Sequence, residues 1–166
     1  MSDKIIFYSS SSFTFALNYF KQMFSKACEY GIRATIFVAK QSVAGRKVGL
    51  IEIADSIDSP EAFTAKILQQ LAKSKIISSA KGPTGGYYLE EYKLEKLRLV
   101  EIVYAIDGDD VYKGCGLGLR KCNEKKPCPL HYEFKEIRDN LKNMLERTFV
   151  KKLAAENEDS LSFLKR

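Results

Sequence analysis

Histidine is nearly absent from this sequence, which has a single one, His131, among 166 residues. Enzymes use histidine more often than any other side chain to move protons. Here it stands near cysteines in the sequence, with no set of nucleophile, base and orienting group around it. No phosphate-binding motif is present either. The sequence therefore predicts a protein that is not an enzyme.

Long apolar runs are also missing. None approaches the roughly 20 residues that cross a bilayer. The N-terminus has no continuous apolar segment that ends at a cleavage site of small residues, as a secretory signal would. We therefore expect a cytoplasmic protein with no membrane partner. In that reducing compartment, clustered cysteines favour a metal site over a disulfide.

The remaining composition is typical of one globular domain with an excess of positive charge. Apolar residues make up 45% of the chain and charged residues 29%, which allows a packed core. The 27 basic and 21 acidic residues give a net charge of +6, which favours an anionic partner such as nucleic acid. Residues 30–49 and 64–87 each contain four Lys or Arg and no Asp or Glu, so both are candidates to face phosphate.

Two consecutive helices are predicted in the first half of the chain. Residues 50–57 carry apolar side chains at helical spacing, and a turn follows at residues 58–60. Ser59 is a good N-cap and Pro60 a natural first helical residue, so a second helix should run to about Lys73. This is a helix-turn-helix pattern.

The second of these helices has two different faces. Its apolar face carries Phe63, Thr64, Ile67, Leu68 and Leu71. Its other face is small, basic and amide-bearing, and consists of Ala62, Ala65, Lys66, Gln69 and Lys73. Such a face suits the major groove, because Lys and Gln can bond base edges and alanine methyls can meet thymine methyls. The alternative is an ordinary solvated helix face. Ser59, just before the helix, is a further candidate DNA contact.

A β-hairpin with a glycine-rich tip is predicted next, from residues 76–80 and 87–89 around the tip at 81–86. Lys81, Gly82 and Thr84 in this tip are candidates to lie along a phosphate backbone or in the minor groove. The alternative is a plain surface hairpin. The fold class expected is mainly α with a small β-hairpin wing, a winged helix-turn-helix.

Two further helices are expected towards the C-terminus, at about residues 97–106, ended by Gly108, and at residues 130–153. The apolar stripe of the second is wide enough to pack against another helix. Its members are Phe134, Ile137, Leu141, Met144, Leu145, Thr148 and Phe149. A partner subunit would cover it, which makes this a long C-terminal dimerisation helix. Packing on its own domain is the alternative.

Between these helices lies an irregular loop with three cysteines. Cys115, Cys122, Cys128 and His131 are separated by six, five and two residues. Thiolates and imidazole suit iron-sulfur clusters or zinc, whereas calcium and magnesium need oxygen ligands. Structural zinc sites space paired ligands two to four residues apart, so these wide gaps favour a cluster. Zinc, or thiols without metal, are the alternatives, and an isolated cysteine, Cys28, is expected in the core.

Four segments together resemble a known family. They are the run from Ser25 to Ala34, the run from Ile53 to Leu68, the run from Lys81 to Tyr87 and the cysteine loop. In this order they resemble the bacterial regulators that include the iron-sulfur cluster regulator (IscR) and the nitric-oxide-sensitive repressor (NsrR). The resemblance covers Met23 to about Val150.

The resemblance implies a homodimeric regulator, usually a repressor, that binds double-stranded operator DNA and responds to iron-sulfur status, redox stress or nitric oxide. The long C-terminal helices would cross, with a recognition helix in each major groove and a wing over each minor groove. The three cysteines would hold a cluster, for which we favour [2Fe–2S] over [4Fe–4S]. The fourth ligand would be His131 in IscR-like members or Glu29 in NsrR-like members. Some cluster-binding members have a glutamate where this sequence has Ala65.

These expectations divide the chain into segments. Residues 1–22 are an N-terminal extension without a sustained period, and because Met23 opens a clear helical pattern, a start codon placed too far upstream is one interpretation. The segments after it are the DNA-binding domain at 23–107, the cluster loop at 108–129, the dimerisation helix at 130–153 and a charged tail at 154–166. An electron-transfer protein would also bind a cluster. It is only a remote alternative, because it would not need the helix-turn-helix and the basic wing.

Overall fold

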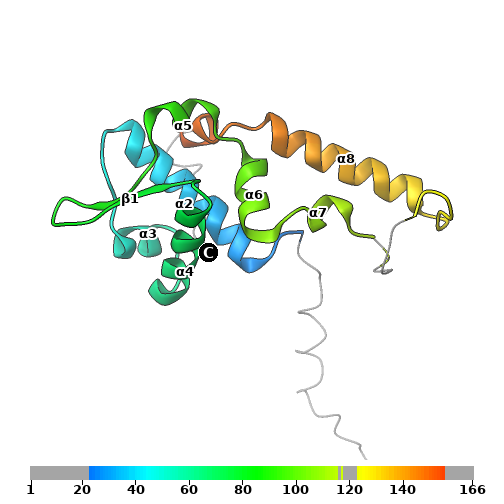
Figure 1. The fold of residues 1–166 in the computed structure, drawn as a ribbon, viewed down its shortest axis with the longest axis horizontal. Coiled ribbons are helices and arrows are strands. Elements are labelled where there is room, and N and C mark those ends of the chain that lie inside the picture. The colour runs from blue at the N-terminus through cyan, green and yellow to red at the C-terminus, as the bar shows by residue number, and fades with distance from the viewer. Residues whose placement is uncertain (1–22, 116, 118–122, 156–166) are drawn as a thin grey trace, which may run out of the picture.

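The computed structural model describes residues 23–115, 117 and 123–155, and within them the fold is mainly helical with one two-stranded hairpin (Figure 1). This is the predicted class. The elements are α2 (Lys26–Val43), α3 (Leu50–Ser56), α4 (Glu61–Lys73), β1 (Ser78–Ala80), β2 (Gly86–Tyr88), α5 (Glu91–Lys96), α6 (Leu99–Asp107), α7 (Asp110–Lys113), α8 (His131–Arg147) and α9 (Val150–Ala154). Among the described residues, none of these helices is long and apolar enough to cross a membrane.

Helix α2 is the central element of the bundle. It begins at an N-cap, Ser25, whose hydroxyl accepts a hydrogen bond from the Cys28 amide at 3.1 Å. It packs against α3, α4, α6 and α9. A Cβ at Gly31 would lie 2.2 Å from the Ile106 Cδ1 atom, so glycine at this position lets α6 approach α2 closely.

The turn between α3 and α4 differs from the prediction in one detail. Asp58 adopts a left-handed conformation at φ 50°, and the Ser59 amide donates to the Ala54 carbonyl at 3.0 Å. These are features of a Schellman-type helix end. Because Ser59 closes α3, Pro60 becomes the N-cap of α4, and its carbonyl accepts from the Thr64 amide at 2.9 Å. The predicted Ser59 cap is therefore wrong.

The predicted hairpin is present as β1 and β2. The strands are antiparallel with Ser79 opposite Tyr87, and an isolated bridge joins Tyr87 to Val48. Gly86 has φ 141°, and a Cβ there would lie 2.7 Å from the Val48 carbonyl oxygen. Only glycine fits this close approach, so the bridge ties the hairpin firmly to the segment that precedes α3.

The predicted helix over residues 97–106 is α6, which ends at Gly108 with φ 71°. Two short helices were not predicted. Helix α5 has six residues, of which only Leu94 is buried, and α7 has four residues, none of them buried. Elements this short bury too few apolar side chains to produce a recognisable period.

The single helix predicted over residues 130–153 is two helices, α8 and α9. Thr148 ends α8 with extended angles, φ −91° and ψ 112°. Phe149 forms an isolated bridge with Arg98, in which the Leu99 amide donates to the Thr148 carbonyl at 3.0 Å. The chain therefore breaks because a pairing with a distant segment replaces the helical hydrogen bonds, and α9 turns back to pack on α2.

The apolar stripe of α8 is covered along one edge only. Leu145 is buried, and Phe134 and Leu141 are half-buried, because α6 and α7 pack against this edge. Ile137 is 59% exposed and Met144 is 47% exposed. Packing on its own domain, which was the alternative, thus accounts for part of the stripe. The rest remains on the surface of α8, which extends away from α3, α4 and the hairpin (Figure 1).

Candidate nucleic-acid interface and metal centre

Helix α4 separates its two faces as the sequence predicts. Thr64, Ile67, Leu68 and Leu71 are buried against the bundle. The opposite face is outside, where Ala62, Lys66, Gln69 and Lys73 are exposed and Ala65 is half-buried. The Gln70 amide donates to the Ala105 carbonyl at 3.0 Å, which holds α4 against α6. The exposed face is therefore presented by a helix fixed on its other side.

The wing carries its exposed residues at its tip. Lys81, Gly82, Pro83 and Thr84 are all exposed. Figure 1 shows the hairpin projecting at the end of the molecule where α3 and α4 lie. A helix face with Lys and Gln and a basic loop tip are thus available at one end of the protein.

Ser59 does not share this exposure. It is half-buried, and its Oγ atom is enclosed with no hydrogen-bond partner among the described residues. The hydroxyl is therefore covered in this structure, although the residue itself is partly exposed.

The sequence reasoning did not single out Arg46 and Lys47. The Lys47 Nζ atom lies 5.0 Å from the ring centroid of Tyr88 in the wing, and Arg46 forms an ion pair with Glu52 at 3.1 Å. The neighbouring Val48–Tyr87 bridge brings Lys47 to the wing, whereas Arg46 lies against α3. The acid-free stretch at residues 30–49 indicated positive charge here, but the bridge that places it depends on a contact distant in sequence.

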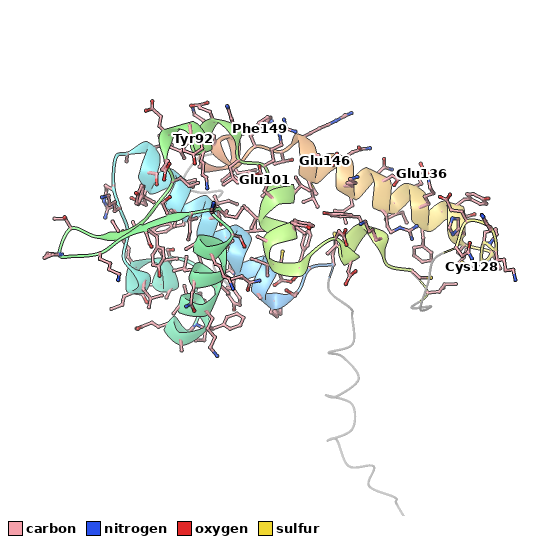
Figure 2. The ribbon with its side chains drawn as sticks, viewed as in Figure 1. Tyr92, Glu101, Cys128, Glu136, Glu146 and Phe149 are labelled. Carbon is pink, nitrogen blue, oxygen red and sulfur yellow. The ribbon has the colours of Figure 1, made fainter. Side chains whose placement is uncertain are left out.

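The cysteine loop connects α7 to α8. Cys115 follows α7 and Cys128 precedes α8, and both side chains are half-buried. The His131 amide donates to the Cys128 carbonyl at 3.0 Å, and the His131 side chain is only 3% exposed. Figure 2 places Cys128 at the opposite end of α8 from Phe149, away from the wing. Cys122 lies outside the described residues.

The described donors do not make a complete metal site. Over residues 23–115, 117 and 123–155, no three side chains of His, Cys, Asp or Glu gather where they could hold a metal ion. Glu29, the other candidate ligand, is on α2 and pairs with Lys26 at 3.0 Å. The chemistry of the donor set, thiols with an imidazole, does fit iron or zinc.

Cys28 is a core residue, as expected. It is fully buried, and burial together with the neighbouring Asp107 carboxylate raises the pKa of its thiol from 9.0 to about 12. Such a thiol stays protonated at neutral pH and is a poor metal ligand or nucleophile. Cys28 is therefore set apart from the loop cysteines, which are the candidate ligands.

Comparison with known proteins identifies the family of this chain. Residues 24–156 match the Rrf2 family, described as iron-dependent transcriptional regulators. A helix-turn-helix-type transcriptional regulator of Aquifex aeolicus is 29% identical over 133 residues, covering 79% of this chain and 90% of that protein. IscR of Escherichia coli is 26% identical over 129 residues, covering 78% of each chain.

Solved structures share the fold. The global cysteine regulator CymR of B. subtilis superposes with a TM-score of 0.66 at 21% identity, covering 81% of this chain and 97% of that chain. IscR of T. potens superposes with a TM-score of 0.62 at 19% identity, covering 81% and 88%. The match to the family extends over most of the chain, and the helix-turn-helix and wing lie within it. The protein therefore belongs to the Rrf2 family and is a DNA-binding transcriptional regulator.

Proposed function

We propose that α4 and the wing read an operator together, with α4 in the major groove and the wing tip on the phosphates of the adjacent minor groove. The observation that carries this proposal is the exposed face of α4 at the same end of the molecule as the exposed tip of the hairpin. The proposed major-groove residues are Ala62, Ala65, Lys66 and Gln69, and the proposed wing contacts are Lys81, Gly82 and Thr84. Ser59 remains a proposed contact at the start of α4, where its Oγ atom is enclosed in the free protein.

Lysine variants distinguish the two kinds of contact. Lys81→Ala should weaken binding to all sequences and lower the slope of log affinity against log salt by about 1, because a phosphate contact releases counterions. Lys66→Ala should also change which operator is preferred. Titration of fluorescent duplexes over a range of salt measures both effects. Lys142→Ala, which removes another exposed charge, on α8, is the control. Equal binding to every duplex at every salt concentration would contradict the proposal.

The regulator is proposed to act as a homodimer through α8. Ile137 and Met144 lie on the same face of this helix and are 59% and 47% exposed, and exposed apolar side chains that share a face mark protein–protein contacts. A second copy would cover them and would also supply the second half-site reader that helix-turn-helix proteins commonly use. Sedimentation at micromolar concentration should give a dimer.

The cysteine loop is proposed to hold an iron-sulfur cluster, [2Fe–2S] in preference to [4Fe–4S], through Cys115, Cys122 and Cys128. Three thiols in one loop support this assignment chemically. His131 is the preferred fourth ligand, because the hydrogen bond from its backbone amide to the Cys128 carbonyl keeps it in the same turn as a cysteine. Glu29, which pairs with Lys26, is the alternative.

A bound cluster would supply a centre that reacts with oxidants and nitric oxide. The chain would then act as a repressor controlled by that centre, in the cytoplasm where its DNA partner lies.

An anaerobic preparation tests the cluster. The protein should be brown, with visible absorbance, iron and sulfide that all disappear in Cys122→Ala and Cys128→Ala. Cys28→Ala is the matched control and should keep the colour, because that thiol is buried and protonated. His131→Ala should make the cluster easier to lose, whereas Glu29→Gln should not. Colourless protein that contains zinc, or no metal, would replace the cluster by a zinc staple or a thiol switch.

A further inference from the structure

The turn between α3 and α4 sets the angle at which α4 leaves the rest of the domain. In this turn Asp58 is left-handed and Ser59 bonds back to Ala54, so the chain reverses over very few residues. The carbonyl groups at a helix C-terminus point out of the helix and carry partial negative charge. The Ile57 carbonyl is one of these, and its residue is 2% exposed.

A side chain from α2 bonds this carbonyl. The Arg33 Nη2 atom donates to the Ile57 carbonyl oxygen. A cation in this position is favourable, because it pairs a full positive charge with the negative end of the α3 dipole in a partly buried setting. Arg33 therefore joins α2 to the point where α3 ends.

The same guanidinium is held from a second direction. Its Cζ atom lies 4.8 Å from the ring centroid of Tyr30, one turn earlier in α2. The Tyr30 ring in turn meets Phe63 in the first turn of α4, edge to face, with centroids 5.6 Å apart. Arg33 and Tyr30 thus contact both sides of the turn, the end of α3 and the start of α4.

We propose that Arg33 is a positioning residue for DNA recognition, which fixes the α3–α4 turn and so the direction of α4 without touching DNA. The proposal rests on the proposed role of α4 as the operator reader. The planar guanidinium is needed because it bonds the carbonyl and stacks on the ring at the same time, which the ammonium of lysine does poorly.

Arg33→Lys in the full-length protein tests this role against a duplex that the wild-type protein has selected from a random pool. Affinity for that duplex should fall about tenfold, as expected for the loss of one charge-assisted hydrogen bond. Affinity for a duplex of shuffled sequence, and the salt slope, should stay within twofold of wild type. Arg147→Lys, an exposed arginine on α8, is the matched control and should change neither affinity.

Other results would overturn the proposal. Equal losses on both duplexes would show that Arg33 only stabilises the fold, and a salt slope lower by about 1 would make it a phosphate contact. If Arg33→Lys does not fold, Tyr30→Leu provides the test. This variant should lower the affinity for the selected duplex by about threefold, through the lost ring contacts, and leave the affinity for the shuffled duplex unchanged. No change in that variant would also contradict the role. If Lys66→Ala leaves sequence preference intact, the operator-reading role of α4 has failed instead, independently of Arg33.

Discussion

The end of this protein with the helix-turn-helix and wing and the end with the cysteine loop are built in different ways. The helix-turn-helix and wing are held by regular elements, buried side chains and the paired amides of Val48 and Tyr87. The cysteine loop follows the short helix α7, which has no buried residue, and the described donors of the loop do not gather into a site. This difference shows that the chain's own hydrogen bonds and buried side chains are enough to fix the arrangement of the first region. The second carries donor residues whose chemistry suits a metal, but its described part does not place them together.

The largest effect should come from cutting a large side chain out of the helix-turn-helix. Leu68 in α4 is fully buried, so Leu68→Ala should lower the free energy of unfolding by about 2–5 kcal/mol, from lost burial plus the remaining cavity. Ile137→Ala in α8 should change it by less than about 0.5 kcal/mol in the monomer, because that side chain is 59% exposed. Urea titrations of both variants at low protein concentration measure the contrast. Similar losses would mean that the two regions are equally packed.

A charge on the exposed stripe of α8 should next affect assembly without affecting the fold. Ile137→Asp should weaken dimerisation by about a hundredfold, since burying an unpaired carboxylate in a contact is costly. Sedimentation measures the dimer constant, and circular dichroism checks that helix content is kept. Asp139→Asn, which changes charge on the exposed side of the same helix, is the control. An unchanged dimer constant in Ile137→Asp would place the dimer contact elsewhere.

A smaller effect is expected from the wing. Gly86→Ala should destabilise the hairpin by about 1–3 kcal/mol, because φ 141° is strained for alanine and its Cβ would meet the Val48 carbonyl. Hydrogen exchange should speed up at the amides of Val48 and Tyr87, which bond each other's carbonyls at 3.0 and 2.8 Å. Ser79→Ala, on the exposed side of β1, should leave both rates close to wild type. Unchanged exchange in Gly86→Ala would show that the bridge tolerates a side chain.

The last effect appears only at alkaline pH and concerns Cys28. Its pKa is raised from 9.0 to about 12 by burial and the Asp107 carboxylate, so the folded state favours the neutral thiol. The resulting stability is complete below pH 9 and is lost as pH rises from 9 towards 12. Unfolding free energies measured across this window should decline in wild type. Cys28→Ala should be less stable at every pH, but its unfolding free energy should not show the fall between pH 9 and 12 that the thiol causes. An identical decline in the variant would assign it to other groups.

The sequence predicted the helix-turn-helix and wing well because burial controls them. The period that runs through Ile67, Leu68 and Leu71 in α4 is the same as the set of side chains that the structure buries. Glycines in the tip likewise marked a real hairpin. Local patterns predict structure reliably where the same residues both define the period and form the core.

The predictions were wrong where distant contacts or left-handed backbone angles determine where a helix ends. Thr148 and Phe149 fit a continuous helix, but pairing with residues 97–99 ends it there. Ser59 lost its capping role because Asp58, not a glycine, takes the left-handed angle that closes α3. Cysteine spacing showed which donors the loop offers, but an irregular loop has no period from which their arrangement could be inferred.

Operator affinity with and without the cluster tests the central claim most directly, since it asks whether the cysteine loop controls the binding of DNA. Anaerobic wild-type protein should change its affinity for its selected duplex by about 5- to 150-fold when the cluster is removed, the usual range of coupling between two sites. Cys128→Ala should show the cluster-free affinity throughout. Equal affinity of brown and colourless protein would contradict the account, and would leave a DNA-binding regulator whose cysteine loop serves another purpose.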